Sequence, residues 1–189
     1  ICRLLDMEKI SRDAASALYM GIAHDTGVFQ YSCTSPETMR LTAALMEKQI
    51  PYTEILEETF YKKTYPQNQV MGKALLESMR LLNGKCIVSV MRQKDMDFFG
   101  VTTTDLDGIV SQMKQTKGIE VAIFLYEVDY MEYKVSLRSE NIVDVSKVAS
   151  YFGGGGHVRA AGVTMKGTFH DIVNNLTLHI ERQLEGRED

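Results

Sequence analysis

Two hydrophobic patterns divide the chain. Through residue 65, apolar residues recur at the three- and four-residue spacing of amphipathic helices. From residue 84 onward, short apolar runs alternate with helical stretches, which is typical of an α/β domain. We therefore expect an α/β protein with a helical first part at 1–65, a connecting helix at 66–83 and an α/β domain at 84–189.

Helix-initiating residues support the helices of the first part. Ser11 and Ser35 are suitable N-caps, and Pro36 stands at a first helical position. Asn83-Gly84 is a strong stop signal. The predicted helices are 11–23, one that begins at Ser35-Pro36, 53–63 and 66–82, and residues 28–32 are expected to form a short extended segment.

The hydrophobic pattern of the second part predicts a sheet with flanking helices. Its central run at 121–128 is continuously apolar, as in a strand buried on both faces. A turn at Asp129-Tyr130 predicts a hairpin with the segment that follows. The predicted strands are 86–92, 97–103, 121–128, 133–138 and 161–165, and the predicted helices are 106–117, 143–152 and one that Thr168 caps.

A run of four glycines at 153–156 is the most informative stretch of the chain. Glycines reach positive φ at low cost, so successive N–H groups can turn toward an anion. His157 and Arg159 follow directly and can donate to phosphate oxygens. We interpret Gly154, Gly155 and Gly156 with these two side chains as a phosphate or nucleotide cradle. The alternative is a plain turn or linker.

Two further places carry candidate chemistry. Arg138-Ser139 ends the predicted hairpin strand shortly before the glycines, and its guanidinium and hydroxyl suit phosphate oxygens. The alternative is a solvent-facing arginine at a strand end. His24-Asp25 follows the first helix, and on spacing alone Asp25 is a turn cap, because a single carboxylate does not make a metal site.

The composition of the chain limits the kinds of ligand, cysteine chemistry and cellular compartment that we expect. The net charge is −4, which argues against a general binding surface for long duplex DNA. The three cysteines are odd in number and lack a CxxC pair, so we expect neither a disulfide framework nor a zinc site. We find no apolar run of membrane-spanning length and no signal-peptide pattern, and we expect a cytoplasmic protein. The cysteines are Cys2, Cys33 and Cys86.

Two motifs resemble the DHH superfamily of phosphoesterases. The stretch GGGGHVRAAG at 153–162, after the Leu-Arg-Ser strand end, resembles the DHHA1 domain. The stretch ALYMGIAHDTGVFQYS at 17–32 resembles the last metal-binding motif of the DHH domain. The order of the motifs fits the family. The pattern DTGxFxYS is most similar to the oligoribonuclease and pAp-phosphatase group, and the cyclic-dinucleotide phosphodiesterases are the second choice.

The resemblance implies a fold, a substrate and a cofactor. It implies a helical remnant of a DHH domain, a helical linker and a DHHA1 domain with a mixed sheet flanked by helices. Two Mn²⁺ ions would activate a water, with Asp25 as one metal ligand. Arg138, Ser139, the glycines, His157 and Arg159 would hold the terminal phosphate of a short RNA or a nucleotide.

One departure from the family pattern shapes the functional expectation. The sequence contains no Asp-His-His. We therefore expect the C-terminal portion of a phosphoesterase, inactive in isolation because its metal site is incomplete. Apolar helix stripes that would otherwise cover a missing sheet favour self-association as a homodimer. A nucleic-acid-binding DHHA1 module without catalysis is the alternative from another class.

Overall fold

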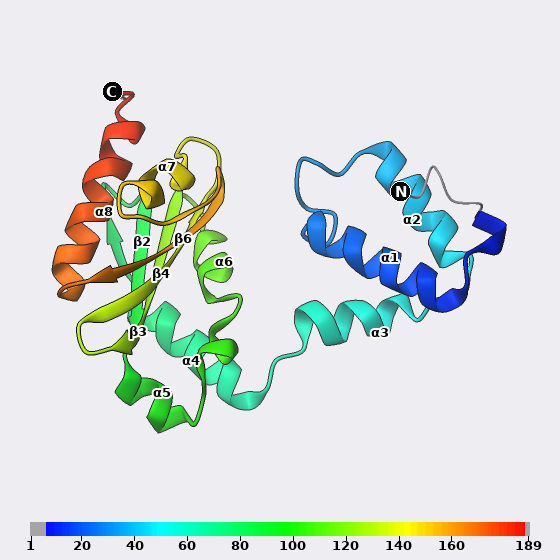
Figure 1. Ribbon diagram of the computed structural model, residues 1–189, viewed down its shortest axis with the longest axis horizontal. Coiled ribbons are helices and arrows are strands. Elements are labelled where there is room, and N and C mark those ends of the chain that lie inside the picture. The colour runs from blue at the N-terminus through cyan, green and yellow to red at the C-terminus, as the bar shows by residue number, and fades with distance from the viewer. Residues whose placement is uncertain (1–6, 188–189) are drawn as a thin grey trace. The chain divides into compact units, whose positions relative to one another are not determined.

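The structure is a computed structural model that describes residues 7–187. It divides into two compact units, residues 1–63 and 64–189 (Figure 1). Cys2 lies outside the described residues. No helix among residues 7–187 is both long enough and apolar enough to cross a membrane.

In unit 1, the regular elements of the described residues 7–63 are all helices. Its buried core consists of Ala15, Tyr19, Leu45 and Ile50. The Tyr19 ring makes edge contacts with Phe29. The elements are the 3₁₀ helix η2 (Met7–Lys9), α1 (Arg12–Asp25), α2 (Pro36–Met46), α3 (Tyr52–Leu56) and the π-helical turn η3 (Glu57–Tyr61).

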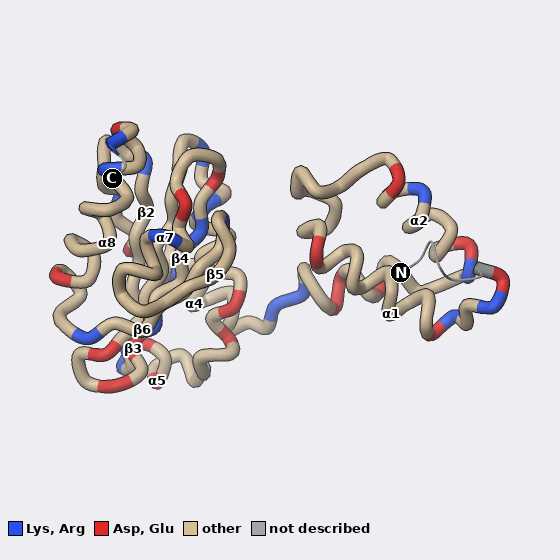
Figure 2. The backbone as a smooth tube through the Cα atoms, turned by 45° about the horizontal axis from the view of Figure 1, so that its top comes forward, with Lys and Arg blue, Asp and Glu red and all other residues tan. Residues whose placement is uncertain are grey.

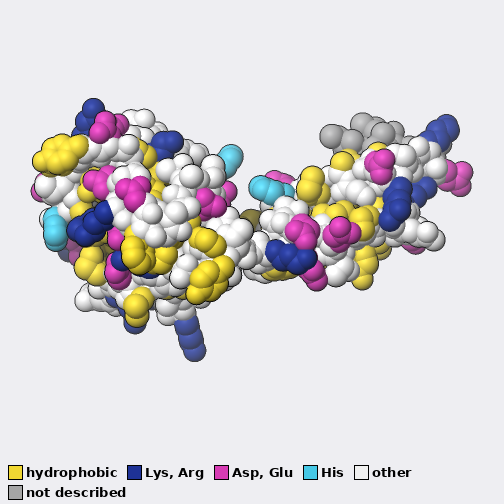
Figure 3. All heavy atoms as spheres, turned by 90° about the horizontal axis from the view of Figure 1, so that it is seen from below, with side chains coloured by type: hydrophobic (Ala, Val, Ile, Leu, Met, Phe, Trp, Pro, Cys, Tyr) yellow, Lys and Arg dark blue, Asp and Glu magenta, His cyan; other side chains and the backbone are white. Residues whose placement is uncertain are grey.

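The predicted helix starts of unit 1 are confirmed. The Ser11 hydroxyl accepts from the Ala14 amide at 3.2 Å and caps α1. Ser35 caps α2, and its amide in turn donates to the Thr38 hydroxyl at 3.2 Å, so two otherwise unpaired N–H groups are satisfied. Large apolar side chains nevertheless remain exposed in this unit, among them Tyr31 and Tyr61. Hydrophobic side chains reach the surface of both units (Figure 3).

Unit 2 is a six-stranded mixed sheet with helices on both faces, as expected. The strand order is β1-β2-β3-β4-β6-β5, and only the β2–β3 pair is parallel. The elements are α4 (Tyr65–Leu76), β1 (Met79–Leu81), β2 (Cys86–Met91), α5 (Gln93–Phe99), η4 (Thr103–Leu106), α6 (Ile109–Lys114), β3 (Val121–Asp129), β4 (Glu132–Ser139), α7 (Val145–Ser150), β5 (Gly155–His157), β6 (Ala160–Lys166) and α8 (Phe169–Leu184).

Each face of the sheet has its own core. Helices α7 and α8 pack on the face that carries Leu137, Ala161 and Val163. Helices α4, α5 and α6 supply the core on the other face, which carries Ala122 and Phe124. Strand β3 is therefore buried on both sides, which explains its continuously apolar sequence.

Three predicted elements are wrong. The helix expected over 66–82 ends at Leu76 and is followed by β1, so the stop signal at Asn83-Gly84 ends a strand instead. The strand expected over 97–103 is the end of α5 and a 3₁₀ turn. Phe98 and Phe99 favour strands by propensity, but an Asp95 cap and the left-handed Gly100 enclose them in a short helix. Residues 28–32, predicted as extended, form turns.

Candidate phosphate-binding hairpin

The four glycines serve different backbone needs. Helix α7 ends with the Gly153 and Gly154 amides donating to the carbonyls of Ser150 and Ala149 at 3.1 and 2.9 Å. Gly153 has φ +77°, the left-handed conformation that closes a helix. The first two glycines therefore turn the chain from α7 into the next strand.

Gly154 and Gly156 are places of close backbone approach. A Cβ at Gly154 would lie 2.4 Å from the Gly162 carbonyl oxygen, and one at Gly156 would lie 2.4 Å from that of Ala160. Gly155 differs, because a Cβ there would meet no atom within 4 Å. Gly155 is exposed and its φ is not in the left-handed range. The fold therefore does not require a glycine at position 155.

The glycines continue into a tight hairpin that the sequence pattern did not predict. Strand β5 pairs with β6 in the register Gly155–Gly162, Gly156–Ala161 and His157–Ala160. Strand β6 pairs in turn with β4, where Ala160 lies opposite Arg138. Residues opposite one another in antiparallel strands point to the same face of the sheet. His157, Ala160 and Arg138 therefore form one row on one face.

The next row on this face is made of small residues. Gly155 lies opposite Gly162, which lies opposite Ser136. Leu137 and Ala161 belong to the core under α7 and α8, so the two rows are on the opposite face from these helices. We call Gly155, Ala160 and Gly162 the hairpin floor. Gly155 and Gly162 are exposed and Ala160 is half-buried.

This arrangement suits an anion. Strands lie about 4.8 Å apart, so the His157 and Arg138 backbones flank Ala160 at about 10 Å from each other. Arg138 offers a planar guanidinium, and one of its nitrogens donates to the Leu137 carbonyl at 2.9 Å. His157 is exposed and offers a ring N–H. Between them, the floor carries no side chain larger than the Ala160 methyl group, which lets a phosphate approach the backbone.

Ser139 and Arg159 are not in these rows. Ser139 is buried, and its hydroxyl donates to the Val158 carbonyl at 3.4 Å. The Arg159 guanidinium donates to the Val143 carbonyl at 2.9 Å and to the Asn141 carbonyl. The structure therefore brings together Arg138, His157 and Gly155, while Ser139 bonds the backbone of the hairpin turn and Arg159 bonds the backbone of residues 141 and 143.

The start of α7 is fixed by Asp144. Its carboxylate accepts from the Ser146 amide at 2.9 Å, the Ser146 hydroxyl at 2.6 Å and the Lys147 amide at 3.1 Å. Burial acts to raise the pKa of Asp144, but the hydrogen bonds from Ser146 and Lys147 outweigh it and hold the pKa below its ordinary value. This cap fixes the helix that leads into the glycines.

Asp25, the predicted metal ligand, is the last residue of α1 in unit 1. The following Thr26 is buried, and its hydroxyl donates to the Ile22 carbonyl at 2.7 Å and accepts from the Phe29 amide at 3.0 Å. Gly27, Val28 and Phe29 all have positive φ. The turn after Asp25 therefore requires Thr26 for its hydrogen bonds and favours glycine at position 27 for its positive φ, so the Thr-Gly pair has a structural explanation.

The residues present do not make a dinuclear metal site by themselves. Over residues 7–187, no three side chains of the His, Cys, Asp and Glu types come together to hold an ion. A centre with two Mn²⁺ ions needs several ligands. Asp25 is therefore at most one of the several ligands that the metal pair implied by the family resemblance would need.

A hollow of about 260 Å³ lies elsewhere in unit 2 and is not part of the hairpin. It is lined by Lys73, Glu77, Val90, Arg92, Lys94 and Asp95. The Lys73 ammonium already pairs with Glu77 at 2.5 Å and with Asp95 at 3.5 Å. Its lining carries three basic and two acidic side chains and none of the residues expected to bind phosphate, so we place the candidate site at the hairpin. Acidic and basic positions are dispersed over both units (Figure 2).

Sequence reasoning missed Ser136 and the role of Ala160 and Gly162 as a floor. The signal was present in the alternation of β4, where Tyr133, Val135 and Leu137 are buried. That period of two puts Ser136 and Arg138 on one face and Ser139 on the other. The same alternation therefore shows that Arg138 and Ser139 of the Leu-Arg-Ser motif cannot contact the same ligand from one face of the sheet.

Residues 83–185, which include the whole hairpin, match the family model described as the DHHA1 domain. The chain belongs to the DHHA1 domain family. This match confirms the resemblance drawn from the glycine motif, and the mixed sheet flanked by helices confirms the expected α/β fold.

Relatives extend the similarity to unit 1. A bifunctional oligoribonuclease and PAP phosphatase of Thermus thermophilus is 30% identical over 171 residues, which are 90% of this chain and 51% of that protein. An A-adding tRNA nucleotidyltransferase of Aquifex aeolicus is 26% identical over 166 residues, 86% of this chain and 19% of that protein. The chain spans about half the length of the phosphatase relatives it matches.

A solved structure has the same fold. An exopolyphosphatase-related protein from Bacteroides fragilis superimposes with a TM-score of 0.90 at 25% sequence identity. The match covers 100% of this chain and 56% of the other. Both the helical first unit and the DHHA1 domain thus have counterparts in a larger protein.

Proposed function

We propose that this chain is the substrate-binding portion of a phosphoesterase that hydrolyses short oligoribonucleotides, pAp or both. The observation that carries the proposal is the row in which Arg138 and His157 flank Ala160 next to the open Gly155. A terminal phosphate would lie on the hairpin floor and accept hydrogen bonds from the two side chains. Relatives named as bifunctional oligoribonucleases and PAP phosphatases support the choice of substrate.

The catalytic chemistry would come from two Mn²⁺ ions in the whole protein, with Asp25 as one ligand. Bound metal ions would supply an activated water and charge stabilisation. The residues of this chain contribute binding and orientation, since a phosphate held on the floor fixes the attached ribose and base. Because the described residues lack the remaining ligands, we expect the isolated chain to release no mononucleotide, even with Mn²⁺ added.

A titration tests the binding claim. Calorimetry with 5′-phosphorylated diadenylate and with unphosphorylated diadenosine monophosphate compares two ligands that differ only in the terminal phosphate. The proposal expects saturable binding of the phosphorylated ligand and binding at least about tenfold weaker without the phosphate. Equal affinities would contradict the phosphate-binding claim. Preferred binding of a cyclic dinucleotide, which has no terminal phosphate, would favour the alternative cyclic-dinucleotide phosphodiesterase.

A second candidate function is a nucleic-acid-binding module without catalysis. The similarity to an A-adding tRNA nucleotidyltransferase favours it, because that enzyme is 26% identical over an alignment that covers 86% of this chain. Binding of a folded tRNA in preference to short RNA would support this candidate. We rank it second because the Asp25-Thr26-Gly27 segment resembles the catalytic half of the family.

The biological assembly is a further part of the proposal. Apolar side chains such as Tyr31 and Tyr61 are more than half exposed in unit 1. We propose that they favour self-association as a homodimer. Sedimentation equilibrium at high protein concentration is the test, and a monomer at all concentrations would contradict it.

A further inference from the structure

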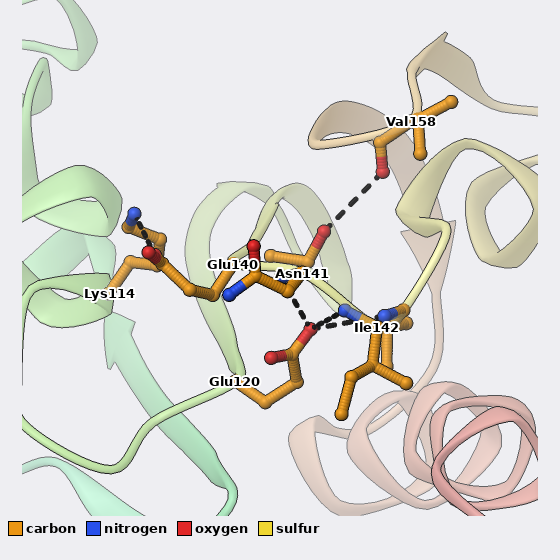
Figure 4. Close-up of polar contacts among 8 residues, drawn as sticks. Lys114, Glu120, Glu140, Asn141, Ile142 and Val158 are labelled. Atoms are coloured by element: carbon orange, nitrogen blue, oxygen red, sulfur yellow. Dashed lines mark hydrogen bonds and ion pairs between the residues drawn. The ribbon is translucent and has the colours of Figure 1, made fainter. Parts of the chain in front are cut away.

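A buried carboxylate lies beside the loop that precedes α7. Glu120 is 7% exposed, and its Oε1 atom accepts from three successive amides (Figure 4). The donors are Asn141 at 3.0 Å, Ile142 at 2.6 Å and Val143 at 3.1 Å. Three N–H groups that converge on one oxygen form an anion-binding concavity, which the protein fills with its own side chain.

The carbonyl groups of the same loop are held as well. The Arg159 guanidinium donates to the Val143 carbonyl at 2.9 Å and to the Asn141 carbonyl. The loop 141–143 is therefore bound through its amides by Glu120 and through its carbonyls by Arg159. Arg159 lies in the β5–β6 turn, so this second contact joins the loop to the hairpin.

Three further hydrogen bonds join the turn of the hairpin to the residues around this loop. The Val145 amide donates to the Val158 carbonyl at 3.0 Å, and the Ser139 amide donates to the Arg159 carbonyl at 3.2 Å. The Ser139 hydroxyl donates to the Val158 carbonyl at 3.4 Å. The turn at 158–159 thus depends on segment 139–145 for its position.

Glu120 is itself firmly placed. Its amide donates to the Lys85 carbonyl at 2.8 Å, and its carbonyl accepts from the Glu140 amide at 2.9 Å. It precedes the buried strand β3 directly. A fixed point at the centre of the sheet is therefore connected through loop 141–143 to an edge hairpin.

We propose that Glu120 is a positioning residue for the phosphate-binding hairpin. By holding loop 141–143, it fixes the turn at 158–159 and so the placement of His157 relative to Arg138. This inference rests on the proposed function for its consequence in substrate binding. Its structural part, the connection between Glu120 and the hairpin, is testable without a ligand.

The chemistry of the contact predicts a graded series of variants. In Glu120→Gln the amide oxygen can still accept from the loop, although without the negative charge. In Glu120→Ala three buried amides lose their acceptor, which is costly in a protein interior. Glu140→Gln is the matched control, because it removes a neighbouring acid that pairs with Lys114 and leaves the three amides bound.

The first experiment is amide hydrogen exchange followed by NMR on the wild type and the three variants. We expect the Val145 amide and the hairpin amides at 155–161 to exchange roughly tenfold faster or more in Glu120→Ala, less so in Glu120→Gln and unchanged in Glu140→Gln. Excess acetate, which can fill the vacated concavity, should slow exchange in Glu120→Ala, whereas chloride should not. If Glu120→Ala does not fold, Glu120→Gln against Glu140→Gln gives the same comparison.

Two results would overturn the inference. One is hairpin exchange in both Glu120 variants at the wild-type rate. The other is an equal acceleration at all protected amides, including those of α4, which would show a general loss of stability.

The second experiment titrates 5′-phosphorylated diadenylate into the same proteins. We expect about tenfold weaker binding in Glu120→Ala, partial recovery in Glu120→Gln and wild-type binding in Glu140→Gln. If the wild type binds and all variants bind equally, the positioning role is wrong. If the wild type does not bind but hairpin exchange responds to Glu120, the proposed function fails and the connection between Glu120 and the hairpin stands.

Discussion

The backbone of Gly154 passes so close to Val163 that a Cβ at position 154 would lie 2.5 Å from the Cβ of Val163. The neighbouring Gly155 has no such contact. Gly154 and Gly155 therefore have different structural roles, although they are adjacent in one motif. Gly154 is needed for the close approach of the α7–β5 connection to β6, whereas the open space at Gly155 is available to a ligand.

This difference predicts opposite outcomes for two alanine substitutions. Gly154→Ala should lower the free energy of unfolding by about 1–3 kcal/mol, because the new methyl group meets backbone atoms that cannot move independently. Gly155→Ala should change it by less than about 0.5 kcal/mol. Urea denaturation of both variants is the measurement. Equal losses of stability would contradict the assignment of separate roles.

His157 should affect binding without affecting stability. Its side chain is exposed, so His157→Ala should leave the urea midpoint unchanged. Loss of a donor to phosphate should weaken binding of 5′-phosphorylated diadenylate by about tenfold or more. His170→Ala, which removes an exposed histidine at the start of α8, is the matched control. A His157→Ala protein with wild-type affinity would remove His157 from the site.

Arg159 should behave in the opposite way. Because its guanidinium bonds two loop carbonyls, Arg159→Ala should cost about 1–2 kcal/mol of stability. Arg159→Lys should recover only part of this loss, since an ammonium lacks the planar fork. The comparison is made by urea denaturation at neutral pH. A fully stable Arg159→Ala protein with impaired phosphate binding would instead place Arg159 in direct contact with substrate.

Asp144 should make stability depend on acid pH. Its pKa is held below the ordinary value of 3.8 in the folded chain. The unfolded chain therefore binds the proton more readily, and the contribution of Asp144 is fully present well above 3.8. It is lost as the pH falls through the lowered folded pKa. Asp144→Asn should accordingly flatten the fall in stability between neutral and acid pH, measured by denaturation at a series of pH values.

The sequence predicted most of the framework, because its signals were local. The structure confirms Ser11 and Ser35 as helix N-caps, and it confirms the apolar run at 121–128 as a central strand. The helix expected over 66–82 is too long at its end, because Met79 and Leu82 fall at helical spacing but pairing with β2 places residues 79–81 in the sheet. Tertiary pairing overrides local spacing at such a place.

The hairpin was not predictable from propensity. Gly155 and Gly156 are poor strand formers, and β5 exists because β6 offers a partner with almost no side chains in the way. The alternation of β4 is enough to predict that Arg138 and Ser139 lie on opposite faces of the sheet. The contacts of Glu120 and Arg159 could not be predicted from the sequence, because they depend on which loops the sheet brings together.

An NMR titration of the isotope-labelled chain with 5′-phosphorylated diadenylate tests the central claim most directly, since it identifies the amides that sense the phosphate. The account predicts saturable shifts that are largest at Gly155, Gly156 and His157 and at Gly162, with smaller effects around Arg138. Shifts confined to the hollow around Lys73 and Arg92, or no saturable shift in a folded protein, would contradict it.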